Sequence, residues 1–382
     1  MTLRQENLGP PGSRSDPLLQ TAEHVPCNTP RPPGRPMAGL EFSEDDVLSA
    51  ARRNGLLSIE LEMTRRCNLR CLYCYSQGGP TLPDEMSLRE AEDVIGQVLA
   101  LGGRKIVILG GGEPFVYPQL QELIELIAGH GLNIEVFTNG TLLDVNMASF
   151  LYCHNVSVVV KRNSQNEAVQ DELAGMQGTF ERIERGLSHL FACGYPDDHH
   201  GLGIQTVICR QNLREIPGLW RWARQRAIQP YFECMTYQGR AVANPGLQVS
   251  RGETGRLFRT LLEIDNGEFG LDWSPHPPLV GAKCQRHLYS LLVKANGDIC
   301  PCVGVEIRTG NIRRDRLADV IRTSHIIQDL RHVYSRIRGT CRACRMNGEC
   351  YGCRGNAYQM TGDYLSSDPF CWIPDEDHGE GG

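Results

Sequence analysis

Short apolar runs alternate with amphipathic helical patterns along most of the chain. In the helical pattern at 87–102, Ser87 stands at the N-cap position and Glu90 follows three residues later, which together predict a capping box. A later helical pattern ends at Gly131, and glycine is common just past helix C-termini. Nearly continuous apolar strands that alternate with helices are typical of a parallel sheet covered by helices. Six such strands are predicted, at 57–64, 105–111, 133–140, 156–163, 202–210 and 229–237.

These six repeats predict an α/β protein, and two architectures fit them: a doubly wound sheet and a partial TIM-type barrel. In both, functional groups lie at the carboxyl ends of the parallel strands. Four loops at these ends are polar or rich in glycine, so we expect them to meet at one rim. They are CNLRCLYC (67–74), GGGEP (110–114), FTNG (137–140) and KRNS (161–164).

Composition narrows the class of protein. The 382 residues include 39 Lys and Arg against 45 Asp and Glu, a formal net charge of -6. This balance offers no broad basic surface, so we expect neither a nucleic-acid nor a membrane partner. The first 40 residues hold no apolar segment typical of a signal peptide, and no apolar run is long enough to span a bilayer. The sequence therefore predicts a cytoplasmic protein.

Changes in composition suggest where the domains begin and end. The start of the chain is rich in proline and poor in aliphatic residues, so it offers little apolar surface to drive ordering. The end of the chain is acidic, which predicts a disordered tail. The predicted divisions are a flexible arm at 1–55, the β–α repeats at 56–240, a helical linker at 241–280, a cysteine-rich domain at 281–374 and an acidic tail at 375–382.

The chain contains 16 cysteines, which in the reducing cytoplasm indicate metal binding or catalysis rather than disulfides. Three lie in CNLRCLYC, and eight more lie in the last hundred residues. The others are scattered, and we expect them to be buried or incidental thiols. They are Cys27, Cys153, Cys193, Cys209 and Cys234.

The three cysteines of CNLRCLYC, Cys67, Cys71 and Cys74, are one short of a closed metal site. A [4Fe-4S] cluster has four irons and usually four thiolate ligands, so three ligands leave one iron open to another molecule. Zinc fits less well, because no nearby histidine completes a tetrahedral set. The spacing also differs from the ferredoxin runs, in which the fourth cysteine is present.

This loop, with the aromatic Tyr73 before its last cysteine, resembles the signature of the radical S-adenosylmethionine (SAM) superfamily. The resemblance implies a partial (β/α)6 TIM-type barrel over about residues 56–240, with Cys67, Cys71 and Cys74 as cluster ligands. In that family SAM binds the open iron. The reduced cluster cleaves SAM to a 5'-deoxyadenosyl radical, which abstracts hydrogen from a substrate.

The resemblance extends to GGGEP, where Gly111, Gly112 and Glu113 match the family's GGE motif for the SAM amino group. Two glycines let the backbone approach closely, and a carboxylate accepts hydrogen bonds from an ammonium group. Other residues at the strand ends match positions that commonly contact SAM in the family. The expected contacts by this match are Tyr73, Thr138, Asn139, Lys161 and Asn163.

A second group of cysteines follows a predicted hairpin with an Asn-Gly turn. It includes CRACRMNGECYGC, in which five residues separate two C-x2-C pairs. Zinc ribbons usually separate such pairs by about 15–20 residues, so a ribbon fits poorly.

This group resembles the SPASM extension, a small cysteine-rich C-terminal domain that carries two auxiliary [4Fe-4S] clusters in some radical SAM enzymes. By this resemblance Cys284, Cys302 and Cys353 would hold the first cluster, and either Cys300 is its fourth ligand or one iron is open. The second cluster would be held by Cys341, Cys344, Cys350 and Cys371.

Candidates for handling the substrate come from strand alternation. Glu60 and Glu62 share one face of the first predicted strand, and Glu233 and Tyr237 share a face of the sixth. With Lys161 at the end of the fourth strand, the candidate catalytic residues are Lys161, Glu233 and Tyr237. The alternative is structural, a Glu–Lys pair that orders the inside of the barrel.

Two other motifs affect the choice of function. DDHH at 197–200 suits either a metal site or a solvated turn, and we expect the turn. The sulfatase-maturing enzymes of the SPASM group have an aspartate directly after the cysteine that matches Cys302. This chain has Val303 there, so formation of formylglycine is disfavoured.

The resemblance implies a radical SAM enzyme that modifies a peptide or protein, supplied with electrons by a donor such as ferredoxin or flavodoxin. The alternative is the same chemistry on a small molecule in cofactor, tetrapyrrole or carbohydrate biosynthesis. A third possibility from a different class is a non-catalytic iron–sulfur electron carrier.

Overall fold

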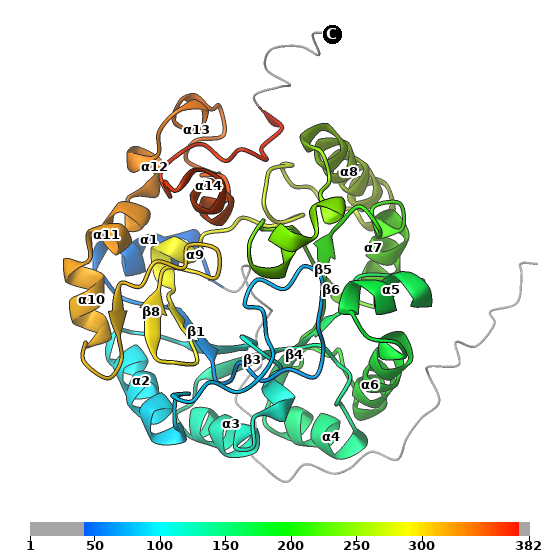
Figure 1. The fold of residues 1–382 in the computed structure, drawn as a ribbon, viewed down its shortest axis with the longest axis horizontal. Helices are drawn as coiled ribbons and strands as arrows, with labels where there is room; N and C mark the ends of the chain where they lie inside the picture. The colour runs from blue at the N-terminus through cyan, green and yellow to red at the C-terminus, as the bar shows by residue number, and fades with distance from the viewer. Residues whose placement is uncertain (1–41, 374–382) are drawn as a thin grey trace, which may run out of the picture.

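Six parallel strands form the centre of the structure, a computed structural model that describes residues 42–373. They are β1 (Ser58–Glu62), β2 (Lys105–Leu109), β3 (Asn133–Thr138), β4 (Val156–Lys161), β5 (Leu202–Ile208) and β6 (Gln229–Cys234). Each strand pairs with the next along the chain, and the curved sheet lies inside a ring of helices (Figure 1). The predicted partial TIM-type barrel is therefore confirmed.

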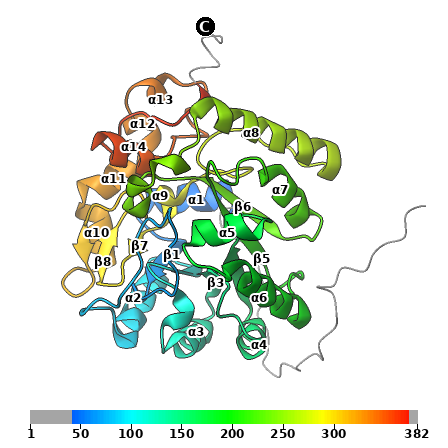
Figure 2. The same ribbon diagram turned by 45° about the vertical axis from the view of Figure 1, so that its right-hand side comes forward.

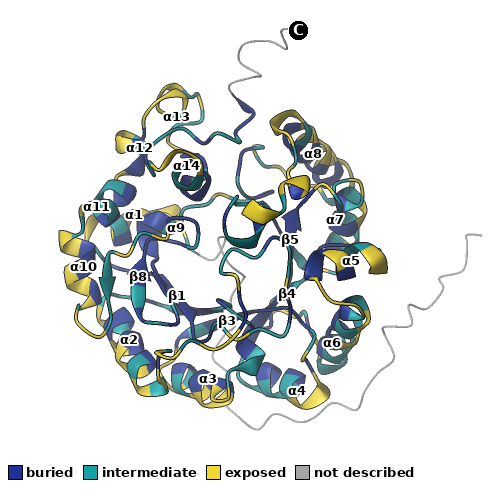
Figure 3. Cartoon of the chain, viewed as in Figure 1, coloured by how far each residue is buried: buried dark blue, intermediate teal, exposed yellow. Residues whose placement is uncertain are grey.

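Helices connect the strands and cover the outer face of the sheet. Figure 3 shows that their inward faces are buried and their outward faces are exposed. Helix α2 (Leu88–Ala100) begins at the predicted capping box of Ser87 and Glu90, and α3 (Leu120–Gly129) ends just before Gly131. Both local predictions are confirmed. The ring continues with α4 (Val145–Cys153), α5 (Glu167–Ala174), α6 (Thr179–Cys193) and α7 (Ile216–Arg224).

The sheet continues beyond the barrel into the C-terminal part of the chain. Strand β7 (Leu292–Val293) pairs parallel with β1, and the predicted hairpin joins β7 to the antiparallel β8 (Asp298–Cys300). Strand β9 (Gly310–Asn311) ends this nine-stranded sheet. At the other edge, residues 278–280 form backbone hydrogen bonds with β6. Both edges of the barrel are therefore paired.

Helix α1 (Glu44–Arg52) corrects the prediction that residues 1–55 form a flexible arm. Ser43 caps the helix, which buries Val47 and Ala50. Figure 2 shows α1 beside α9 (Arg286–Tyr289), with which it is in contact. The apolar side chains buried here explain why this segment is folded.

The buried guanidinium of Arg331 fastens α1 to the C-terminal region. It donates to the carbonyl oxygens of Ala50, Gly55 and Leu288 at 3.2, 2.7 and 3.3 Å. These bonds join the end of α1, the segment that follows it and α9 through one buried side chain. The arm residues 1–41 and the tail from 374 lie outside the described residues.

Short elements complete the described chain, and none of its helices is long and apolar enough to cross a membrane. After β6 come the 3-10 turns η3 (Gly239–Ala243) and η4 (Pro245–Leu247), then α8 (Arg251–Ile264) and the π-helical turn η5 (Asp265–Phe269). A 3-10 turn, η2 (Pro114–Val116), follows β2. The C-terminal helices are α10 (Leu317–Thr323), α11 (His325–Arg331), α12 (Val333–Arg336), α13 (Thr340–Ala343) and α14 (Arg354–Thr361).

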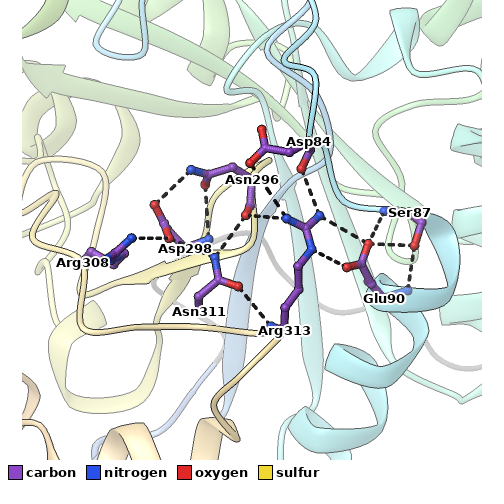
Figure 4. Close-up of polar contacts among 8 residues, drawn as sticks. All are labelled: Asp84, Ser87, Glu90, Asn296, Asp298, Arg308, Asn311 and Arg313. Atoms are coloured by element: carbon purple, nitrogen blue, oxygen red, sulfur yellow. Dashed lines mark hydrogen bonds and ion pairs between the residues drawn. The ribbon is translucent and has the colours of Figure 1, made fainter.

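Arg313 connects the C-terminal strands with the start of α2 (Figure 4). Its Nε lies 2.5 Å from Glu90 Oε1, and its Nη2 donates to Asp84 O at 2.9 Å. Its Nη1 donates to Asn296 O, in the turn between β7 and β8, at 3.3 Å. The carboxylate of Glu90 therefore serves both the capping box and the contact between the two parts of the chain.

Candidate active site

A cavity of about 210 Å³ lies inside the barrel at the carboxyl ends of its strands. The four loops that we expected to meet at one rim each contribute to its wall. The segment 279–290, which leads into the C-terminal part, closes it from the other side. The cavity therefore connects the first cysteine loop with Cys284, the first of the C-terminal cysteines. Its lining includes Cys67, Cys71, Tyr73, Cys74, Gly111, Gly112, Glu113, Thr138, Asn139, Lys161, Glu233 and Cys284.

The loop after β1 brings Cys67, Cys71 and Cys74 to the cavity wall. Its backbone is held by a hydrogen bond from Cys67 N to Gly79 O of 3.0 Å. Burial raises the pKa of the Cys67 thiol to about 12, so a metal that binds there must displace a proton. Leu69 N donates to Cys67 Sγ at 3.4 Å, a bond of the kind that supports cluster thiolates. This donor set fits an iron–sulfur cluster.

The GGGEP turn approaches the cysteine loop closely because its glycines lack side chains. A Cβ on Gly112 would clash with the carbonyl oxygen of Arg66, and a Cβ on Gly111 would meet the carboxylate of Glu62 at 2.6 Å. A larger residue at either position would push the turn away from the cysteines.

Glu113 is buried at the cavity wall and is held by three donors. It accepts hydrogen bonds from Thr138 Oγ1 at 2.6 Å, Asn139 N at 2.7 Å and Phe115 N at 3.1 Å. Burial raises the pKa of Glu113 to about 7, although these donors lower it. Thr138 and Asn139 therefore orient a carboxylate that an incoming cation would stabilise in its charged form.

Tyr73 and Lys161 lie together at the cavity wall, whereas Asn163 is buried behind it. Asn163 Nδ2 donates to the Tyr73 hydroxyl at 2.6 Å. Lys161 Nζ lies 5.3 Å from the centre of the Tyr73 ring, within cation–π range. Among residues 42–373 no carboxylate pairs with Lys161, so its charge is available to an anionic group in the cavity.

Tyr237 lies outside the main cavity, and the expected shared face of Glu233 and Tyr237 does not form. Strand β6 ends at Cys234, so strand alternation no longer applies to Tyr237. Tyr237 lines a separate small pocket, and its hydroxyl donates to Val242 O at 3.4 Å. Glu233 does line the main cavity and accepts from Gln205 Nε2 at 2.6 Å.

Buried ion pairs cross the inside of the barrel. Glu60 pairs with Arg286 at 2.7 Å, so its partner comes from the C-terminal part rather than from the predicted lysine. Lys105 and Glu135 pair at 2.6 Å, and the sequence analysis missed them. Both line the cavity, and the inward alternation of β3 was the signal that could have identified Glu135. Glu62 is buried behind the wall, where burial raises its pKa.

Cys284, Cys302 and Cys353 share one neighbourhood. Burial and the nearby carboxylate of Asp368 raise the pKa of Cys353, and the Cys284 and Cys302 thiols raise it further. These are the three residues that the SPASM resemblance assigns to the first auxiliary cluster.

Cys341, Cys344, Cys350 and Cys371 form the second neighbourhood. Burial raises the pKa of Cys350 to about 12, and Cys341, Asp368 and Cys344 add to the rise. Burial also raises the pKa of Cys371, and the nearby Asp368, Cys350 and Cys341 raise it further. The four residues assigned to the second auxiliary cluster therefore lie together.

Backbone N–H groups point at the sulfur atoms of several C-terminal cysteines. Hydrogen bonds to thiolates stabilise iron–sulfur clusters and tune their potentials. Four donors lie two or three residues further along the chain, the donor to Cys341 is Asp368 N, and the N–S distances are 3.2 to 3.4 Å. The acceptors are Cys302, Cys341, Cys344, Cys350 and Cys353.

Cys300 differs from the other C-terminal cysteines. It lies on β8, and burial raises its pKa to about 12. Lys294 and Asp298 act on it more strongly than the Cys302 thiol does. In residues 42–373 no N–H group donates to Cys300 Sγ.

Cys234 is closer to this region than the sequence analysis expected. It lines the cavity at the end of β6, and its pKa is raised by burial, then by Asp368 and Cys353. Its distance from the other cysteines along the chain gave no signal of this. Among the remaining scattered cysteines, Cys209 is buried and Cys193 is half-buried, both as free thiols, and Cys27 lies outside the described residues. Cys153 is disulfide-bonded, so the expectation of an incidental thiol is wrong for this residue.

The DDHH turn is only partly solvated. His200 is buried, stacks on Tyr152 with ring centres 3.8 Å apart, and lies 2.7 Å from Asp197 through Nδ1. The expectation of a solvated turn is therefore wrong for His200, because Tyr152 offers a ring to stack on. In the described chain no three metal-binding side chains gather as a single metal ion would need.

Comparison with known proteins supports this organisation. The radical SAM superfamily model matches residues 61–223, and the iron–sulfur cluster-binding SPASM model matches 284–354. The AdoMet-dependent heme synthase of Methanosarcina barkeri is 26% identical over 351 residues, which cover 84% of this chain and 97% of that protein. The mycofactocin maturase MftC of Mycobacterium tuberculosis is 27% identical over 334 residues, 81% of each chain.

Solved structures show the same fold. SuiB of Streptococcus suis bound to S-adenosylmethionine superimposes with a TM-score of 0.64 at 16% identity, over 83% of this chain and 77% of SuiB. The enzyme anSMEcpe with bound AdoMet and a peptide gives a TM-score of 0.63 at 17% identity, over 84% and 94%. The cofactors of this protein are [4Fe-4S] clusters and SAM. The chain belongs to the radical SAM superfamily and is an iron–sulfur enzyme with a C-terminal SPASM domain.

Proposed function

We propose that Cys67, Cys71 and Cys74 hold the [4Fe-4S] cluster that binds SAM, and that a substrate is oxidised in the barrel cavity. The observation that carries this proposal is the single cavity that joins the three-cysteine loop to Cys284. When bound, the cluster and SAM supply a 5'-deoxyadenosyl radical that removes one hydrogen atom from the substrate.

The cavity residues divide between SAM and substrate. Glu113, oriented by Thr138 and Asn139, would accept a hydrogen bond from the SAM ammonium group, whose positive charge would favour the carboxylate form of Glu113. Lys161, which no carboxylate pairs among residues 42–373, would bind the SAM carboxylate. Glu233 lies in the substrate half, where it takes a proton or a hydrogen bond from the substrate. The ion pairs of the wall keep the remaining charges fixed and exclude water.

The C-terminal cysteines complete a two-electron oxidation. We propose that Cys284, Cys302 and Cys353 would hold a first auxiliary cluster able to accept the second electron of the substrate, while the accompanying proton would pass to Glu233. SAM is consumed, giving methionine and 5'-deoxyadenosine. Val303 lines the cavity beside Cys302, so no carboxylate base acts from that position.

We propose that Cys300 does not ligate the first auxiliary cluster, because among residues 42–373 no N–H group donates to its sulfur, in contrast to Cys302 and Cys353. We also propose domain limits of 56–240 for the barrel and 281–374 for the SPASM part. A low-potential carrier of the ferredoxin or flavodoxin class supplies electrons in the cytoplasm.

The first substrate class that we propose is a small molecule of the tetrapyrrole type. The match with the AdoMet-dependent heme synthases extends over nearly their whole length, which supports this class. Lys283 and Arg286 line the cavity near Cys284, but each is paired with a carboxylate, Glu349 at 3.3 Å and Glu60 at 2.7 Å, so the support for this class comes from the similarity to the heme synthases.

A peptide is the second candidate. The equally similar MftC is a maturase, and its match also covers most of both chains. The two substrate classes make opposite predictions for a single assay.

The test uses full-length protein reconstituted anaerobically with iron and sulfide, then given SAM and dithionite. Release of 5'-deoxyadenosine is expected, and its absence would contradict the proposed chemistry. Addition of Fe-coproporphyrin III should accelerate this release and yield an oxidised product by mass spectrometry. A response only to a precursor peptide encoded near the gene would select the second class.

A further inference from the structure

The turn η3 packs against the cysteine loop from behind the cavity. A Cβ on Gly239 would clash with the carbonyl oxygens of Cys74 and Tyr75. Gly239 also has φ of +57°, which favours glycine. Asn244, just after the turn, donates to Leu72 O at 3.2 Å. The backbone of the cysteine loop is therefore covered by this turn.

Arg240 makes the most direct contacts between the turn and the loop. Its Nε donates to Cys71 O at 2.8 Å and its Nη1 donates to Gly78 O at 3.1 Å. Its backbone N donates to Cys74 O at 3.0 Å. One residue therefore binds three carbonyl groups of the loop, two of them on proposed cluster ligands.

The charge of Arg240 is not neutralised by another side chain. Its guanidinium donates to carbonyl oxygens, and among residues 42–373 no carboxylate lies within ion-pair distance. The side chain is partly buried, so water screens its charge less than at an exposed site. Its hydrogen bond to Cys71 O places this charge at the backbone of a proposed cluster ligand.

We propose that Arg240 is a positioning residue for the SAM-binding cluster, which fixes the loop and places there a positive charge that favours the reduced cluster. Reduction adds one negative charge, and a fixed positive charge nearby stabilises the reduced state more than the oxidised state. This inference rests on the proposed assignment of Cys67, Cys71 and Cys74 as cluster ligands.

The test is a redox titration of the reconstituted protein, monitored by electron paramagnetic resonance. The signal to measure is the one whose shape changes when SAM is added, because it belongs to the SAM-binding cluster. At a fixed solution potential, the ratio of reduced to oxidised cluster should be about tenfold lower in Arg240→Gln than in wild type. This corresponds to a midpoint potential about 59 mV lower. Arg240→Lys keeps the charge and should titrate near the wild type. The iron content of each variant shows whether the cluster is intact.

Arg70→Gln is the matched control. Arg70 lies in the same loop and donates to Cys67 O and Leu69 O, both at 2.8 Å, but its side chain is exposed. Water screens its charge, so its shift should be less than half of that in Arg240→Gln.

Two results would overturn the proposal: an unchanged potential in an iron-replete Arg240→Gln, or a potential in Arg240→Lys as low as in Arg240→Gln. If the signal that responds to SAM survives in Cys71→Ala, the assignment of Cys71 as a ligand of that cluster is refuted instead. The failure of the proposed function is thus distinguished from a failure of the role of Arg240.

Discussion

The two cysteine-rich regions differ in how they surround their thiols. Cys67, Cys71 and Cys74 all line the cavity, and in the described chain only Cys67 accepts a backbone N–H bond among them. Of the C-terminal ligand candidates, Cys284 lines the cavity, while five others accept backbone N–H bonds, four of them from donors two or three residues away. The thiols of the first region therefore reach the cavity together, whereas backbone donors contact most of those in the second. This difference is the one expected between a cluster that binds SAM and clusters that carry electrons.

The largest expected effect is the loss of SAM cleavage when a cysteine of the first region is removed. Cys71→Ala should reduce 5'-deoxyadenosine formation to background and remove roughly four irons per chain, because two thiolates cannot hold the cluster that binds SAM. Chemical analysis of iron and chromatography of the nucleoside measure both quantities. Cys193→Ala, at a half-buried cysteine outside both groups, should leave both unchanged.

Loss of an auxiliary ligand should uncouple SAM cleavage from product formation. Cys350→Ala removes a thiol of the second group, so about four irons are lost, while the cavity and the first loop are intact. We expect the rate of 5'-deoxyadenosine release to stay within about tenfold of wild type, a change in activation free energy of at most about 1.4 kcal/mol, because the SAM site is untouched. The oxidised product should disappear. Equal loss of both products would show that the two regions do not act separately.

Glu113→Gln should weaken SAM binding without removing iron. A hydrogen bond to a charged group contributes about 1.5–3 kcal/mol, so the KM for SAM should rise roughly 10- to 150-fold. The pKa of Glu113 in the free protein is about 7, so the charged form is lost as pH falls through 7, and SAM affinity should fall with it. A wild-type affinity that stays constant from pH 8 to pH 6 would contradict this role. The Gln variant should show no such dependence.

The smallest effect concerns the contact between the regions. Arg313→Ala removes the partly exposed pair with Glu90 and the bonds to Asp84 O and Asn296 O. Exposed pairs contribute about 0.2–1 kcal/mol, so the thermal midpoint of the anaerobic holoprotein should fall by only a few degrees. Arg322→Ala, which breaks an exposed pair within α10, is the control and should produce no measurable change. A fall larger than 10 °C would show that Arg313 does more than join two surfaces.

Local signals in the sequence predicted the local structure well. The capping box of Ser87 and Glu90 depends on residues three apart, and it forms as expected. The strands and the loops at their ends also follow from short patterns. The helix α1 had its own local signals, Ser43 as N-cap and three acidic residues in the first turn, but the proline-rich neighbourhood concealed them.

Contacts between distant segments could not be predicted from the sequence. Arg286 lies 226 residues from Glu60, and nothing in either local pattern indicates the pair. Cys234 lies near Cys353 because residues 278–280 bring the C-terminal part against β6. Tyr237 was misplaced because alternation was extended beyond the last residue of the strand. Such placements depend on tertiary packing, which a single sequence does not reveal.

The pairing of β7 with β1 has a consequence for how the protein is made. When the ribosome has produced the sixth strand, the first strand still has one apolar edge without a partner, because its neighbour is encoded more than 50 residues later. Unpaired strand edges recruit other chains. A fragment that stops before residue 292 should therefore aggregate even though it contains every strand of the barrel, and chaperones are expected to be needed until that partner emerges.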